Sequence, residues 1–205
     1  MANLPSSIAT AESSDGRTRR AARSRAAIED ALFALVGEGN AQPTMQEVAT
    51  RAGVAMRSVF RHYSDSESLF AAIDTRVRME ALALLREPDL SARLPDRIAA
   101  LARQRARIFE HIGPYKRAGD LQRGRSPYVR SQQAHLVDEL RARLALWLPE
   151  LAAAPGEVRE AVELVLSFEA WDRLRRGQRL GVARATAVLE HTVATLLPSR
   201  RAARR

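Results

Sequence analysis

Residues 44–63 read TMQEVATRAGVAMRSVFRHY, and this stretch is the most informative part of the sequence. Thr44 followed three residues later by Glu47 is the pattern of a capping box. In such a box the Thr side chain accepts a bond from an orphan helix amide, and the Glu side chain reaches back to the Thr backbone. The pattern predicts a short helix over 45–51. Gly53 ends this helix because glycine adopts the left-handed backbone of a tight turn without strain.

A second short helix is expected over 55–62, after a three-residue turn. Two short helices that cross at close range need a small residue at their contact, and Ala49 supplies it. The second helix needs an apolar residue on its buried side, and Val59 supplies it six positions after Gly53. These features are typical of a helix-turn-helix, the motif whose second helix enters the major groove of DNA. A helical hairpin with a structural role only is the alternative.

The segment before this unit is an arginine-rich helix, expected over about 18–36. Its apolar residues fall on one face and its arginines on the other. Residues 17–63 hold eight arginines against four acids, whereas residues 64–198 have an excess of three positive charges over a much longer span. The leading arginines are Arg17, Arg19, Arg20, Arg23 and Arg25. Positive charge beside a helix-turn-helix suits contact with DNA phosphates; a solvated helix start is the alternative.

In the remainder of the chain the apolar residues recur with the period of a helix, and they do not alternate with polar residues as in a strand. A second capping box, Ser64 to Glu67, opens a long helix. Further helices are expected over 94–112, 127–148, 157–176 and 181–197, and Gly113-Pro114 is expected to break the first of them. The sequence therefore predicts an all-α fold, with an N-terminal three-helix helix-turn-helix domain and a C-terminal helical bundle for ligand binding and dimerisation.

We expect four segments along the chain. These are a flexible arm over 1–16, a DNA-binding domain over 17–64, an effector-binding and dimerisation domain over 65–198 and a basic tail over 199–205.

The composition of the 205 residues argues against several classes of protein. There is no cysteine, which excludes disulfides and thiol chemistry. The four histidines show no metal-ligand spacing, and no phosphate-binding glycine loop or Gly-x-Ser-x-Gly motif occurs. We therefore expect neither an enzyme, a cofactor nor a metal site. No run approaches the roughly 20 apolar residues that span a bilayer, and no secretory signal is visible, so we expect a cytoplasmic protein that binds no membrane.

The stretch from Arg25 to Phe70 resembles the DNA-binding domain of TetR-type transcriptional regulators. The matching elements are a lead helix ending in Gly39, Thr44-Met45-x-x-Val48-Ala49, Ala52-Gly53-Val54-Ala55, Ser58-Val59-Phe60-Arg61-His62-Tyr63 and Glu67-x-Leu69-Phe70. Trp171-x-x-Leu174-Arg175 and the helix after it are similar to the last two helices of many such regulators. The resemblance implies an all-helical homodimer with a DNA-binding head and a larger body that usually holds a small effector.

The chain departs from the family pattern at three positions. Phe60 stands where the family usually has a tyrosine whose hydroxyl touches phosphate. Ser66 stands where a lysine is frequent, and Ala55 where a serine or threonine commonly starts the reading helix. The positive charges of Arg57, Arg61 and the Arg17–Arg25 run can replace the electrostatic part of these contacts.

Residues of the second short helix are the candidates for DNA contact, because only its first turns reach base edges. Arg57 is the best candidate for a base contact, since a guanidinium pairs with guanine through two hydrogen bonds. Arg61 lies one turn on and reaches a base or a phosphate. Ala55 and Met56 are candidates for a thymine methyl group. The candidates for phosphate contact are Thr44, Ser58 and His62.

Two late helices are apolar on more than one side and are therefore candidates for a dimer interface. The helix over 157–174 is apolar almost all round, and the final helix adds a second apolar surface. Paired with their copies they form a four-helix interface. The candidate residues are Val165, Phe168, Val188 and Leu189. The alternative is that both faces are buried within one chain.

Aromatic and polar residues in the body suggest an effector pocket. The candidates are Phe109, Tyr115, Tyr128, His135, Trp147 and Trp171, with an ordinary hydrophobic core as the alternative. The function expected is that of a repressor that a small molecule releases from a palindromic operator on double-stranded DNA. Two alternatives stay open, a DNA-binding regulator or architectural protein without an effector, and a helical protein-interaction module.

Overall fold

The computed structural model describes the backbone of residues 8–122 and 127–197, and the side chains of residues 16–121 and 137–197. Within these ranges the chain forms helices and no strand, which confirms the prediction of an all-α fold. The elements are α1 (Ile8–Gly37), α2 (Met45–Ala52), α3 (Met56–His62), α4 (Ser66–Ala83), α5 (Leu94–Gln122), α6 (Pro127–Trp147), a 3₁₀ turn (Pro149–Ala153), α7 (Gly156–Val165), α8 (Phe168–Asp172), a π-helical turn (Arg173–Gly177) and α9 (Val182–Leu196).

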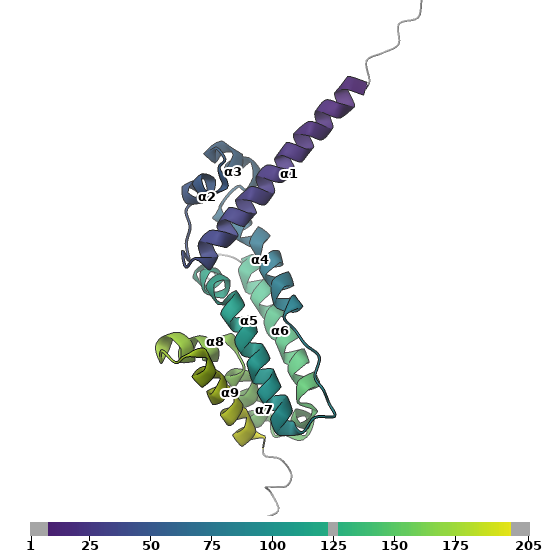
Figure 1. Cartoon of the computed structure of the whole chain (residues 1–205), viewed down its shortest axis with the longest axis vertical. Coiled ribbons are helices and arrows are strands. Elements are labelled where there is room, and N and C mark those ends of the chain that lie inside the picture. The colour runs from purple at the N-terminus through teal and green to yellow at the C-terminus, as the bar shows by residue number, and fades with distance from the viewer. Residues whose placement is uncertain (1–7, 123–126, 198–205) are drawn as a thin grey trace, which may run out of the picture.

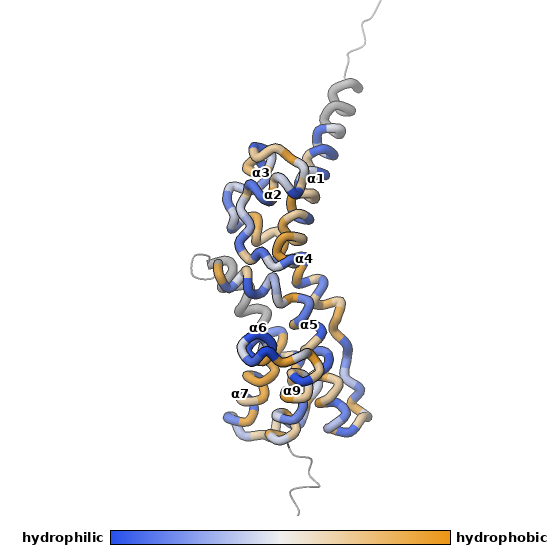
Figure 2. Tube along the Cα trace, turned by 60° about the vertical axis from the view of Figure 1, so that its left-hand side comes forward, coloured by the Kyte–Doolittle hydropathy of each residue, from blue (hydrophilic) through white to orange (hydrophobic). Residues whose placement is uncertain are grey.

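The molecule is elongated (Figure 1). A head made of α1, α2, α3 and the start of α4 lies at one end, and α1 projects beyond the other helices of the head. A body made of α5 to α9 lies at the other end. Figure 2 shows hydrophobic and hydrophilic residues alternating along the helices of both parts. In the described ranges no helix combines the length and apolar character needed to cross a bilayer.

Two hydrophobic cores correspond to the head and the body. The head core contains residues of α1, α2 and α3, and also Leu69, Phe70 and Ile73 of α4 and Ala118 of α5. The body core is built from α5 to α9, and the later part of α4 packs against it. The head core therefore continues past the boundary expected at residue 64, because α4 takes part in both cores.

Helix α1 begins at Ile8 rather than near Thr18. No proline lies between Pro5 and Pro43, and the alanines and Glu12 of this segment favour helix. The part of the expected arm that the structure describes, residues 8–16, is thus helical. Residues 1–7 and the expected basic tail over 199–205 lie outside the described residues.

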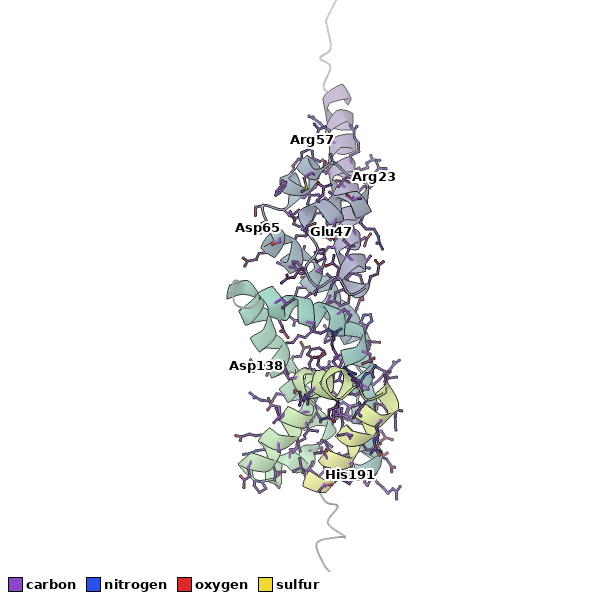
Figure 3. All side chains as sticks on the ribbon, turned by 90° about the vertical axis from the view of Figure 1, so that its left-hand side faces the viewer. Arg23, Glu47, Arg57, Asp65, Asp138 and His191 are labelled. Carbon is purple, nitrogen blue, oxygen red and sulfur yellow. The ribbon has the colours of Figure 1, made fainter. Side chains whose placement is uncertain are left out.

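The expected break at Gly113-Pro114 is wrong, because α5 runs through Pro114 to Gln122. Figures 1 and 3 show that α5 instead changes direction in its last third. Proline removes one helical hydrogen bond and bends a helix without ending it when neighbouring helices hold both halves. Each half here has such a neighbour, since the first packs in the body core and Ala118 in the head core.

Two other local predictions differ from the structure. The helix expected over 157–176 is divided, because the Ser167 side chain accepts a hydrogen bond from the amide of Ala170 at 3.2 Å and starts α8 anew. The second capping box is displaced by one residue, with Asp65 as the N-cap of α4 and Ser68 as its partner. Aspartate is as good an N-cap as serine, so the neighbouring residue takes the role.

Candidate nucleic-acid interface

The turn between α2 and α3 has the geometry that the sequence predicts. The amide of Glu47 donates to the Thr44 hydroxyl at 3.2 Å, and the amide of Thr44 donates to the Glu47 carboxylate at 2.7 Å, which confirms the capping box. Gly53 has φ 65° and ψ 31°, in the left-handed region. The amide of Val54 then donates to the carbonyl of Ala49 at 3.1 Å. Glycine at this position lets the chain reverse without a strained side chain.

The inner side of the α2–α3 unit contains three buried apolar residues. Val48 and Val59 are completely buried, and Ala49 is 1% exposed. They pack in the head core with Ile28 and Leu32 of α1. The small side chain of Ala49 leaves room for the crossing of the helices, so α3 is held rigidly on α1 and α2.

The outer side of α3 presents Arg57 and Arg61, which are exposed and one helical turn apart. Neither forms a hydrogen bond or an ion pair anywhere in the described chain. Figure 3 places Arg57 at the head end of the molecule, far from His191 at the body end. These two arginines therefore have their full donor capacity available to a partner.

Neighbouring arginines of the head serve the fold instead. Arg51 forms a bridge to Glu38, with 3.0 Å between Nη1 and Oε2. Arg25 pairs with Glu29 at 2.9 Å, and its guanidinium lies 5.8 Å from the centre of the Tyr63 ring. Of the lead-helix arginines, Arg25 is thus committed to an internal contact.

The other predicted DNA-contact residues are placed unequally. Ala55 is exposed at the start of α3, whereas Ser58 is half-buried and Met56 packs against the head core. The Thr44 hydroxyl donates to the Glu47 carboxylate at 2.7 Å. Thr44 must therefore give up this bond before it can donate to a phosphate.

His62 is turned inward rather than toward the outer face. Its Nε2 atom is buried without a hydrogen-bond partner. Burial lowers the pKa of His62, and the positive charges of Arg61 and Arg25 lower it further. A neutral, partly buried imidazole is a poor phosphate ligand. Tyr63 beside it is buried and donates its hydroxyl to Glu29.

Phe60 is a residue of this surface that the sequence did not single out as a contact. Its side chain lies on α3 between Arg57 and Arg61 in sequence and is 51% exposed. Single exposed apolar residues are common on protein surfaces, so this ring is a feature of the face and is not by itself evidence of a contact. In the sequence, Phe60 is recognisable as an apolar residue that directly follows Val59 and therefore lies off the buried face of the helix.

The residues expected at a dimer interface divide into two pairs. Phe168 and Leu189 are 6% and 1% exposed, buried in the core of the single chain. Val165 and Val188 are half-buried at the edge of that core. Leu164, next to Val165 on α7, is 66% exposed. Of the residues on α7 and α9, Leu164, Val165, Val182 and Val188 thus leave apolar surface outside the core of the single chain.

A cavity of about 390 Å³ lies among α5, α6, α7 and the start of α8. Its lining residues are Arg105, Phe109, Ile112, Lys116, Val137, Asp138, Leu140, Arg141, Leu144, Glu163, Leu166, Ser167, Phe168 and Glu169. Of the predicted pocket residues only Phe109 is among these described lining groups. Trp147 is buried in the body core, and the Trp171 indole donates to Glu110 at 2.9 Å. The side chains of Tyr128 and His135 lie outside the described residues.

Tyr115 connects the body to the head rather than lining the cavity. Its ring stacks on Phe33 of α1 with 4.4 Å between ring centres. The Arg76 guanidinium lies 4.0 Å from the centre of the Phe33 ring. A Cβ at Gly37 would come within 2.9 Å of the Tyr115 hydroxyl, so a larger residue at this position would require the Tyr115 ring to shift.

Among the described residues, no group of three histidine, cysteine, aspartate or glutamate side chains is arranged to hold a metal ion.

The fold is similar to that of a solved protein. The crystal structure of a transcriptional regulator from Rhodococcus sp. Rha1 matches with a TM-score of 0.61, covering 86% of this chain and 95% of that chain, at 20% sequence identity. At this identity the likeness shows a common fold. No family model and no curated protein sequence matches the chain.

Proposed function

We propose that this protein is a DNA-binding transcriptional regulator of the TetR type. In this proposal the head binds a palindromic site on double-stranded DNA as part of a homodimer. A small molecule in the body cavity then releases the head, so that the protein acts as a repressor. The similar fold of a transcriptional regulator supports the general class.

The observation that carries the proposal is the outer face of α3. Arg57 and Arg61 are exposed without internal partners, while Arg25 and Arg51 in the same head are paired with acids. The face is fixed by buried residues below it, and Gly53 sets its angle to α2. A rigid helix that presents two unpaired guanidinium groups is suited to major-groove recognition.

The bent end of α5 supports a coupling between ligand binding in the cavity and the position of the head. Ile112 and Lys116 line the cavity. Between them Tyr115 stacks on α1, and one turn later Ala118 is fully buried in the head core. A ligand that displaces this segment changes the position of the head. Such a ligand has a different affinity for the two positions of the head, and this difference is what an allosteric effector needs.

Exposed apolar residues support a homodimer through α7 and α9. Leu164 of α7 is mostly exposed, and Val165 of α7 and Val188 of α9 are half-buried. Burial of this surface against a second copy places two heads in one particle. A dimer doubles the number of base pairs read and predicts a site with two-fold symmetry.

The test is selection of bound fragments from random duplex DNA by the full-length protein. We expect recovery of a palindromic sequence and an affinity that falls steeply with salt. Arg57→Ala should relax the sequence preference and weaken binding by about 1–3 kcal/mol. Arg93→Ala, which removes an exposed charge beside Asp96 at the start of α5, is the matched control and should leave binding unchanged.

Failure to enrich any sequence would overturn the proposal of a sequence-specific regulator. Salt-dependent binding without enrichment would favour an architectural protein instead. Retention of the wild-type preference by Arg57→Ala would remove α3 as the reading helix.

A further inference from the structure

Arg105 is a buried charge that the proposed function does not use. It lies in the middle of α5, lines the cavity and is 3% exposed. Its Nη2 donates to the carbonyl of Leu140 at 3.0 Å, but Nε and Nη1 are buried without a hydrogen-bond partner. A buried guanidinium that lacks acceptors destabilises a protein. The unused donors therefore point to a group that is brought into the cavity from outside.

Arg97, two turns earlier on the same helix, is the internal comparison. It is 6% exposed, nearly as buried as Arg105. Its Nη1 donates to the carbonyl of Trp147 at 2.9 Å and its Nη2 pairs with Glu150, although Nε has no partner. The fold thus supplies a carboxylate to one buried arginine of α5 and none to the other.

The other cations of the cavity are already paired. Lys116 lies 2.8 Å from Asp120 and 3.4 Å from Glu169. Arg141 contacts both carboxylate oxygens of Glu163, at 2.7 and 2.8 Å. Among the described lining residues, Arg105 is the cation that lacks an acidic partner.

Apolar side chains make up much of the remaining described lining, and two of its acids, Glu163 and Glu169, are paired with Arg141 and Lys116. Phe109, Leu144 and Phe168 are among the lining side chains. Burial, together with the charge of Arg143, lowers the pKa of Arg105 to about 10. The guanidinium therefore stays protonated at neutral pH, and its charge has no acidic partner among the described residues that line the cavity.

We propose that the cavity binds an apolar monocarboxylate, whose carboxylate pairs with Arg105 while its hydrocarbon part lies against Phe109 and Phe168. A guanidinium matches a carboxylate in shape and hydrogen bonding. One unpaired positive charge balances one negative charge, and the acids Asp138 and Glu163 in the lining oppose anions of higher charge, such as phosphate esters. The inference rests on the proposed function, because it names the chemical class of the effector.

The test compares two probes of nearly the same shape, phenylbutanoate and its neutral amide, by calorimetric titration of the full-length protein. We expect the wild-type protein to bind the acid at least about tenfold more tightly than the amide. Arg105→Met should abolish this preference and Arg105→Lys should restore part of it. Arg97→Met, which removes the other buried arginine, should keep the preference.

Equal affinity of the wild-type protein for acid and amide would overturn the inference, and this comparison needs no variant. An unchanged preference in Arg105→Met would overturn it too. Absence of binding at millimolar concentration, for phenylbutanoate and for hexanoate and decanoate alike, would also overturn it. These titrations contain no DNA. Carboxylate binding by a protein that enriches no DNA sequence would therefore refute the proposed function and leave the ligand class standing.

Discussion

Replacement of Arg105 by methionine is expected to stabilise the ligand-free protein. Burial, and to a lesser extent Arg143, lowers the pKa of Arg105 to about 10. At about 1.4 kcal/mol per pKa unit, the charged form is penalised by about 3 kcal/mol in the folded state. Because the folded pKa lies below that of the unfolded chain, the unfolded chain holds the proton more tightly. The penalty is therefore present in full at neutral pH and disappears only as the pH rises above about 10.

The substitution also removes one favourable contact. The carbonyl of Leu140 loses the donor that lies at 3.0 Å, which costs about 1 kcal/mol. The net gain is about 1–2 kcal/mol, which corresponds to a rise in Tm of roughly 2–8 °C for a chain of this length. Thermal and urea unfolding followed by circular dichroism at pH 7, without ligand, measure this gain.

The control is Arg97→Met. That substitution removes a carbonyl contact and an ion pair with Glu150, so it should lower the free energy of unfolding by about 1–3 kcal/mol. Opposite signs for the two variants are the expected result. A loss of stability in Arg105→Met as large as that in Arg97→Met would show that the charge of Arg105 is compensated within the folded chain, and the reasoning would be refuted.

Three further predictions concern the head and its link to the body. Gly53→Ala should lower the free energy of unfolding by about 1 kcal/mol because of the positive φ alone, since an added Cβ meets nothing within 4 Å. Gly119→Ala, in open space inside α5, should raise the free energy of unfolding by about 0.5–1 kcal/mol, because alanine favours a helix over glycine. Urea titrations compare the two variants. The hydrogen bonds from Thr44 lower the pKa of Glu47, so the stability from this cap is present above pH of about 4 and lost as the pH falls further; Glu47→Gln should flatten that part of the pH profile. Tyr115→Ala should leave ligand affinity within about twofold but weaken the release of DNA by ligand, and an unchanged release would exclude the stack on α1 as the coupling contact.

The features that were predictable from the sequence are those that depend on neighbouring residues. The capping box needs only Thr44 and Glu47, and the left-handed turn needs only Gly53, so their local chemistry specifies both. The all-α class follows from helical periodicity along most of the chain. None of these features requires knowledge of which helix packs on which.

The features that could not be predicted depend on contacts between distant segments. Pro114 usually stops a helix, but here the residues on each side of it are held by different cores. The apolar pattern alone predicts a continuous helix over 157–176, and it does not show that the N-cap bond of Ser167 starts α8, in which Phe168 and Trp171 are buried. At Pro114 local propensity gives way to tertiary packing.

Aromatic residues are poor markers of the pocket in this chain, because Trp147 and Trp171 are buried in the body core. The useful marker is a charged residue on an apolar stripe. Arg105 falls at helical spacing between Leu101 and Ile108, where a solvated arginine has no place.

The sharing of α4 and α5 between the two cores has a consequence for protein engineering. Leu69, Phe70 and Ile73 of α4 and Ala118 of α5 complete the hydrophobic interior around α1 to α3. A fragment cut after residue 64 would leave that interior open to water and should not fold in isolation. A chimaera that transplants the reading head onto another sensor must carry α4 and the bent end of α5 with it.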